Sequence, residues 1–261
     1  MLSTKELWVI PIVTTLQDEN VRTTFDKELT PRVEELLELI EQSRDEGNTE
    51  QELKQSLQLY DVLKQRKQQD ADVFEVAFGI ARIYDDQLED SGTATIYYRD
   101  ALAMLEAIST RPSVEGAYMR VTTLGALAMC YENLYVIFAY CRLVLVNPLS
   151  FDAPTSGQSE DATNYFNDAI SAYEEHCDQA SKVGSSEVDV SDSDISLLLN
   201  LNATAAMIHY HFAGNLLAQE RWDEAKNVTK IALELAENSS MSTEELEELQ
   251  HCIHELWLEL E

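Results

Sequence analysis

Histidine and cysteine are the side chains whose types could bind a metal ion, but their spacing in this chain does not favour such a site. His209 and His211 lie two residues apart in a helical pattern, about 200° around the helix, so they cannot ligate one ion together. His251 and His254 flank Cys252, yet a zinc site there would need ligands from elsewhere. Neither Cys-x-x-Cys nor His-Glu-x-x-His occurs. We therefore expect no metal ion and no cofactor.

Motifs for catalysis are absent as well. The sequence contains no glycine-rich phosphate loop of the GxGxxG or GxxxxGK[ST] type and no GxSxG nucleophile turn. Carboxylate pairs are abundant among the 48 Asp and Glu residues, but acid–base catalysis needs two carboxylates whose pKa values are pushed apart. Spacing alone does not show this. The sequence favours a protein that is not an enzyme, with a helical enzyme or small-molecule sensor as an alternative.

The charge of the chain restricts its partners. Its 48 acidic and 18 basic residues give a formal net charge of −30, which disfavours nucleic acid and anionic membrane surfaces. A basic protein segment is favoured, although acidity can also serve solubility alone. Residues 151–261 hold 23 acids and four bases, against 25 and 14 in residues 1–150. The second half is therefore the better candidate for docking a basic partner.

An acidic, serine-rich segment at 183–194 is predicted to be a solvated loop. It lacks the central glycine and terminal glutamate of a calcium-binding loop. Ser186 and Ser191 each have an acid three residues later, a pattern typical of acid-directed phosphorylation.

Only 8 Gly and 5 Pro occur in 261 residues, which favours an all-helical fold. Apolar periodicity predicts about nine or ten helices, close to residues 15–47, 49–68, 71–88, 93–108, 114–131, 134–146, 160–182, 195–219, 222–237 and 243–260. The short apolar piece Leu7–Val13 is the one stretch whose pattern suits a strand. The very apolar stretch 134–146 is too short to span a bilayer and carries Arg142, so we expect a buried helix and no membrane insertion.

The predicted organisation has three parts. Residues 1–48 form an N-terminal segment and helix, residues 49–242 form helical repeats with loops at 149–160 and 183–194, and residues 243–261 form a capping helix. Asp194 and Ser242 are the expected N-caps, with Ser242 and Glu245 in a capping box. The four cysteines lack the pattern of a disulfide framework, so a cytoplasmic or nuclear location is expected.

One spacing recurs along the sequence: a small residue is followed four positions later by a larger residue, and three positions after that by another small residue. Small side chains at this spacing indicate that two helices pack closely. Its copies are Ala94/Tyr98/Ala101, Ala162/Phe166/Ala169 and Ala225/Thr229/Ala232, with Ser56/Tyr60/Leu63 as a looser one. An apolar–small pair followed three residues later by a larger residue precedes three of these, as in Phe212-Ala213 with Leu216.

These residues resemble the tetratricopeptide repeat (TPR), a helix–turn–helix unit of about 34 residues. The best match is 206–239, residues 74–107 match moderately, and residues 121–148 and 158–182 match in part. The resemblance implies a right-handed α-solenoid of antiparallel helical hairpins, with a peptide-binding groove lined by the first helix of each unit. An α-solenoid of other ancestry would give similar hairpins.

The same register implies which residues face that groove: Glu75, Phe78, Arg82, Asp85, Asp86, Met129, Glu132, Asn133, Met207, Tyr210 and Leu217. The family's basic clamp for acidic chaperone tails is missing, because only Arg82 is basic. Acids beside methionine and aromatic residues suit a basic amphipathic segment instead. We therefore predict an adaptor or scaffold, or alternatively a holding chaperone for a basic client. Whether the N-terminal helix covers the groove is left open.

Overall fold

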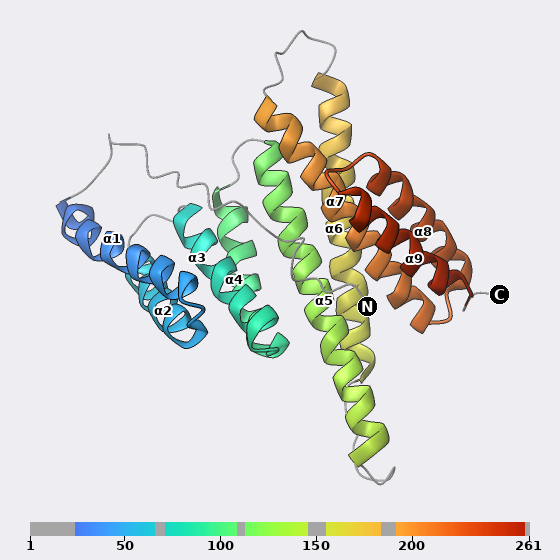
Figure 1. Cartoon of the computed structure of the whole chain (residues 1–261), viewed down its shortest axis with the longest axis horizontal. Coiled ribbons are helices and arrows are strands. Elements are labelled where there is room, and N and C mark those ends of the chain that lie inside the picture. Colours follow the sequence, from blue (N-terminus) through green and yellow to red (C-terminus); the bar gives the residue numbers. More distant parts are fainter. Residues whose placement is uncertain (1–23, 66–70, 109–112, 146–154, 184–191, 259–261) are drawn as a thin grey trace. The chain divides into compact units, whose positions relative to one another are not determined.

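The computed structural model describes residues 24–65, 71–108, 113–145, 155–183 and 192–258, which are helical apart from short turns (Figure 1). The helices are α1 Thr24–Asp45, α2 Thr49–Lys64, α3 Ala71–Arg82, α4 Ser91–Ile108, α5 Val114–Leu145, α6 Thr155–Val183, α7 Asp192–Ala218, α8 Trp222–Glu237 and α9 Thr243–Leu258, with a π-helical turn, η1, at Ile83–Gln87. The described residues contain no strand, so the all-α prediction is confirmed. They form two compact units, α1–α4 and α5–α9. The solenoid arrangement stays a prediction, and the possible strand at Leu7–Val13 lies outside the described residues.

The α1–α4 unit is built from two helical hairpins. Gly47, with a φ of 66°, makes the turn between α1 and α2, because this left-handed conformation costs glycine little. Leu36, Leu59 and Phe74 are almost completely buried between the helices. The buried carboxylate of Glu52 is paired with Arg44, whose Nε lies 2.8 Å from Oε1 of Glu52.

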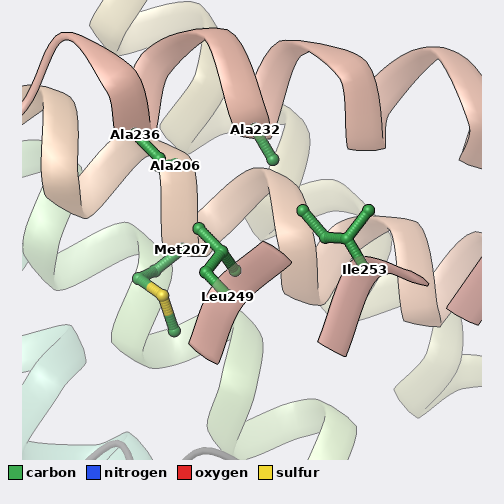
Figure 2. Packing of buried hydrophobic residues seen from close by; sticks show 6 residues of the cluster. All are labelled: Ala206, Met207, Ala232, Ala236, Leu249 and Ile253. Carbon is green, nitrogen blue, oxygen red and sulfur yellow. The ribbon is translucent and has the colours of Figure 1, made fainter. Parts of the chain in front are cut away.

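The α5–α9 unit is organised around α5, α6 and α7, with α8 and α9 packed on α7. Phe166 of α6 and Phe212 of α7 are buried and stack with their ring centroids 5.4 Å apart. A second apolar cluster joins α7, α8 and α9, and consists of Ala206, Met207, Ala232, Ala236, Leu249 and Ile253 (Figure 2). The small alanine side chains let α8 lie close against α7. Leu249 and Ile253 of α9 pack against the same cluster.

Residues with the small–large–small spacing are buried in all four copies. Almost no surface is exposed at Ala94 and Ala101, or at the three residues of each copy in α6 and α8. The side chain of Tyr98 is 3% exposed. The looser copy at 56, 60 and 63 is buried too. The spacing therefore marks helix-packing positions, as expected.

The N-caps predicted from sequence have different outcomes. Ser242 and Glu245 form the expected capping box: the Ser242 amide donates to Oε2 of Glu245 at 2.6 Å, and the Glu245 amide donates to Oγ of Ser242 at 3.3 Å. Asp194 was expected as the N-cap of α7, but the helix begins at Asp192, so Asp194 lies inside the first turn.

Several helix boundaries differ from the expected ones. The stretches 114–131 and 134–146 form one continuous helix of 32 residues, α5, because neither glycine nor proline stands between them. Helix α6 begins at Thr155, inside the segment expected as a loop at 149–160. Helices α5, α6 and α7 have 32, 29 and 27 residues, so each is nearly as long as a whole 34-residue two-helix unit. The TPR resemblance stays a prediction.

Candidate functional site

A carboxylate–imidazole pair lies between two long helices of the α5–α9 unit. Glu132 is near the middle of α5, and His211 lies in the last third of α7. Nδ1 of His211 is 3.8 Å from Oε2 of Glu132, which is longer than a hydrogen bond. The two side chains keep 21% and 22% of their exposure, so the pair is mostly enclosed but reachable from solvent. Nε2 of His211 is buried and has no hydrogen-bond partner.

Burial shifts the two pKa values in opposite directions. It raises the pKa of Glu132 to about 7, because a carboxylate loses hydration between the helices. It lowers the pKa of His211 to about 4, because the imidazolium form is disfavoured for the same reason. At neutral pH the imidazole is therefore uncharged, and the carboxyl group is about half ionised.

Tyr210 connects this region to α9. Its ring is 5.2 Å from the His211 ring in an edge-to-face arrangement. Burial first, and then Cys252, Glu132 and Glu255, raise the pKa of Tyr210 to about 12; its hydroxyl is hydrogen-bonded with Cys252. Tyr210 is therefore a neutral phenol at physiological pH, packed against the apolar cluster of Figure 2.

The first turns of α7 carry an apolar surface that none of the other described helices covers. Ile195, Leu198 and Leu199 are exposed by 46%, 38% and 37%, and we call them the α7 stripe. The stripe exists because α7 has 27 residues whereas α8 has 16, so α7 continues past the end of the α8–α9 hairpin (Figure 1). The sequence did not lead us to predict this stripe. The signal that could have indicated it is the set of apolar residues that begins at Ile195, eleven positions before Ala206.

Helices α6 and α8 contact α7 at the stripe and one turn beyond it. The Ser240 amide donates to the Leu199 carbonyl at 3.2 Å, which fixes the end of α8 beside the stripe. One turn further along α7, Asn202 accepts from the Tyr173 hydroxyl at 2.8 Å and donates to the Asn238 carbonyl at 2.7 Å. Exposed acids follow or precede these contacts in sequence: Glu174 and Glu175 follow Tyr173 on α6, and Glu237 precedes Asn238. The stripe is thus an exposed apolar surface on a unit whose neighbouring helices carry exposed acids.

The structure distributes the predicted partner-binding residues over both units. Glu75, Phe78 and Arg82 lie on α3 and Asp85 and Asp86 in η1, where Nη2 of Arg82 is 3.0 Å from Oδ2 of Asp86 and the Ser91 hydroxyl donates to Asp85. The others lie on the packed helices α5 and α7: Met129, Glu132, Asn133, Met207, Tyr210 and Leu217. Phe78, Met129 and Met207 are buried in the cores of their units, and the other eight are at least partly exposed. Whether these residues contact a partner stays a prediction.

The other histidines have separate surroundings. Nδ1 of His209 lies 2.7 Å from the Ala205 carbonyl of its own helix. His251 lies 3.5 Å from Glu255 on the exposed face of α9. Among the residues that the structure describes, no three His, Cys, Asp or Glu side chains are placed to hold a metal ion.

A scan against models of protein families and a search of curated proteins gave no match to this chain. Within the described ranges, no helix is both long and apolar enough to cross a membrane.

Proposed function

We propose that the chain is a non-enzymatic scaffold that binds a basic, amphipathic protein segment, as an adaptor, subunit or assembly factor of a larger complex. The observation that supports this most is the exposed α7 stripe, which lies on a strongly acidic unit. An amphipathic helix with apolar residues on one face and Lys or Arg on the other complements such a surface. Its apolar face would cover the stripe, and the exposed acids of α6 and α8 would attract its cations.

The surrounding charge supports the same partner. Between Thr155 and Asp178 the sequence of α6 contains no Lys or Arg, while its exposed face carries Glu160, Asp161, Asp168, Glu174, Glu175 and Asp178. Such a field attracts a basic segment and repels an acidic one, which gives both speed and selectivity to the encounter. The resemblance of residues 206–239 to a peptide-binding repeat family points the same way.

Two other functions remain as candidates. A holding chaperone would use the same surface for a basic client. A helical enzyme or small-molecule sensor is favoured by Glu132 and His211, because oppositely shifted pKa values are typical of acid–base sites. We prefer segment binding because the lowered pKa leaves His211 a weak base at neutral pH and burial keeps the neighbouring Tyr210 a neutral phenol.

A charge-matched pair of variants tests the proposed surface. The probe is a synthetic amphipathic helix of leucine and arginine, and Leu198→Lys is expected to weaken its binding about tenfold or more. The reason is that the substitution removes apolar contact and adds repulsion, which together exceed about 1.4 kcal/mol. The measurement is titration calorimetry at low salt.

Ile231→Lys is the matched control, because Ile231 lies on α8 with a similar exposed fraction of 42% and the substitution adds the same charge. The Ile231→Lys variant should bind the leucine–arginine helix less than about threefold more weakly than wild type, since only the long-range electrostatic field of the protein changes. A leucine–glutamate helix should not bind. Equal losses in the two variants, or equal binding of the two peptides, would show that the surface is not the docking site.

A further inference from the structure

Glu132 is a mostly enclosed carboxylate that pairs with no Lys or Arg among the described residues. Its nearest basic neighbour is the His211 imidazole at 3.8 Å, and burial keeps that ring uncharged at neutral pH by lowering its pKa to about 4. No hydrogen bond to the Glu132 carboxylate is found among the described residues. An enclosed carboxylate without a partner is unfavourable, because its lost hydration is not replaced.

The titratable groups that face Glu132 are neutral or negative at pH 7. Helix α7 contributes His211 and Tyr210, and α9 contributes Cys252 and Glu255 around Tyr210. Helix α6, which packs on α5, brings Tyr165 against Tyr131, with ring centroids 5.4 Å apart. None of these groups carries a positive charge at neutral pH.

The cationic side chains described in this unit are engaged or remote. Arg221 pairs with Glu224 at 2.6 Å. Arg120 is twelve residues from Glu132 along α5, which is about 18 Å of helix. Lys226 and Lys230 lie on the exposed face of α8. The carboxylate nevertheless reaches solvent, because its side chain keeps 22% of its exposure and the next residue, Asn133, is exposed.

We propose that Glu132 is the anchoring site for a single cationic side chain, an arginine or lysine of the basic partner, which enters beside Asn133 and ion-pairs with the carboxylate. This inference rests on the proposed function and adds a second contact to it, because His211 lies twelve residues after Leu199, about 18 Å further along α7 and on another side of that helix. The cation supplies a positive charge that no described residue of the unit places at this position. The neutral rings of His211 and Tyr210 form the walls, where a paired charge interacts more strongly than it would in water.

Binding at this site is coupled to a proton. The free carboxyl group has a pKa raised to about 7, whereas an ion-paired carboxylate stays ionised well below that pH. A cationic ligand therefore expels the proton, and its affinity rises with pH. From a pKa near 7, the dissociation constant should fall about tenfold between pH 6 and pH 8.

The test uses the leucine–arginine helix as the probe and the full chain as the protein. Titration calorimetry at constant ionic strength is run at pH 6, 7 and 8 on wild type and Glu132→Gln. Wild type should bind about tenfold more tightly at pH 8 than at pH 6. Glu132→Gln should change less than about twofold and bind about tenfold more weakly than wild type at pH 8. Repeating pH 7 in buffers of different ionisation enthalpy should show release of about half a proton by wild type and none by the variant.

Glu248→Gln is the matched control, because Glu248 is exposed on α9 and its replacement removes the same charge. It should keep the wild-type pH dependence, which separates the effect of Glu132 from the effect of losing one negative charge. If Glu132→Gln binds as tightly as Glu248→Gln with the same pH dependence and proton release, the anchoring site is refuted while the proposed function stands. If the peptide binds none of the three proteins, the proposed function itself fails.

Discussion

Replacing Phe166 with alanine is expected to lower the free energy of unfolding of the α5–α9 unit by about 3–5 kcal/mol. Phe166 has no exposed surface and stacks on Phe212, so its ring joins α6 to α7. Truncation removes the transfer energy of the ring and leaves a cavity that the long, stiff helices cannot close. The unit should remain folded but unfold at a lower urea concentration.

Tryptophan fluorescence is a suitable readout, because two of the three tryptophans, Trp222 and Trp257, lie on α8 and α9. A Trp8→Phe background restricts the signal to that unit. Asn167→Ala is the control, since Asn167 is the exposed neighbour on the same helix and should change stability by less than about 0.5 kcal/mol. A loss below about 1 kcal/mol for Phe166→Ala would mean that α6 and α7 do not pack as described.

Glu132→Gln is expected to stabilise the α5–α9 unit at pH 8 and to leave its stability at pH 4.5 almost unchanged. Burial raises the pKa of Glu132 to about 7, from 4.5 in the unfolded chain. Between these two pH values the folded protein holds a proton that the unfolded chain has released, so wild-type stability falls as pH rises. Glutamine is neutral at every pH and escapes this loss.

The expected gain grows from near zero at pH 4.5 to roughly 1–3 kcal/mol above pH 7. His211 acts in the opposite direction, because its lowered pKa makes stability rise between about pH 4 and 6.5. Because His211 lies 3.8 Å from Glu132, the two titrations are coupled between these pH values. At pH 8 the imidazole is uncharged in the folded and the unfolded chain, so the difference in stability at that pH reports Glu132.

Urea unfolding at pH 4.5, 6 and 8 in the Trp8→Phe background measures this difference. Glu248→Gln again serves as the control and should stay within about 0.5 kcal/mol of wild type at each pH, because Glu248 is exposed. If Glu132→Gln has the same effect at pH 4.5 as at pH 8, the carboxyl group does not titrate in the way that its burial implies.

Helix content and packing positions could be predicted from the sequence because they depend on local patterns. The small–large–small spacing identified Ala162, Phe166 and Ala169, and all three are completely buried. The Ser242–Glu245 capping box followed from two residue types at a fixed spacing. Such features lie within a few residues of one another, so periodicity and propensity determine them.

Features that depend on helix length could not be predicted in the same way. Asn133 was read as the boundary between two helices, but it sits inside α5, because an asparagine between apolar turns weakens a helix without ending it. The α7 stripe is exposed because α7 is longer than α8, the helix that packs on it. The lengths of both helices must be compared to see this, and the apolar pattern of α7 alone does not show it.

The Glu132–His211 pair is a feature of the candidate site that could not be predicted from the sequence. The two residues are 79 positions apart, so no motif links them, and only the packing of α5 on α7 brings them within 3.8 Å. Glu132 was predicted as a partner-binding residue from repeat register, without its shifted pKa. The sequence suggested only a metal-binding role for His211, and its spacing from His209 argued against that role. In the structure His211 lies beside Glu132, and burial lowers the pKa of its imidazole.

The salt dependence of segment binding tests the central claim most directly. The leucine–arginine helix is titrated into wild type at about 50 mM and about 300 mM salt at pH 7.5, and charge complementarity predicts that the affinity falls at least about tenfold. Apolar contact with the α7 stripe would keep some binding at the higher salt concentration. An affinity that is the same at both concentrations would contradict the claim that this acidic helical protein binds a basic segment through its charge.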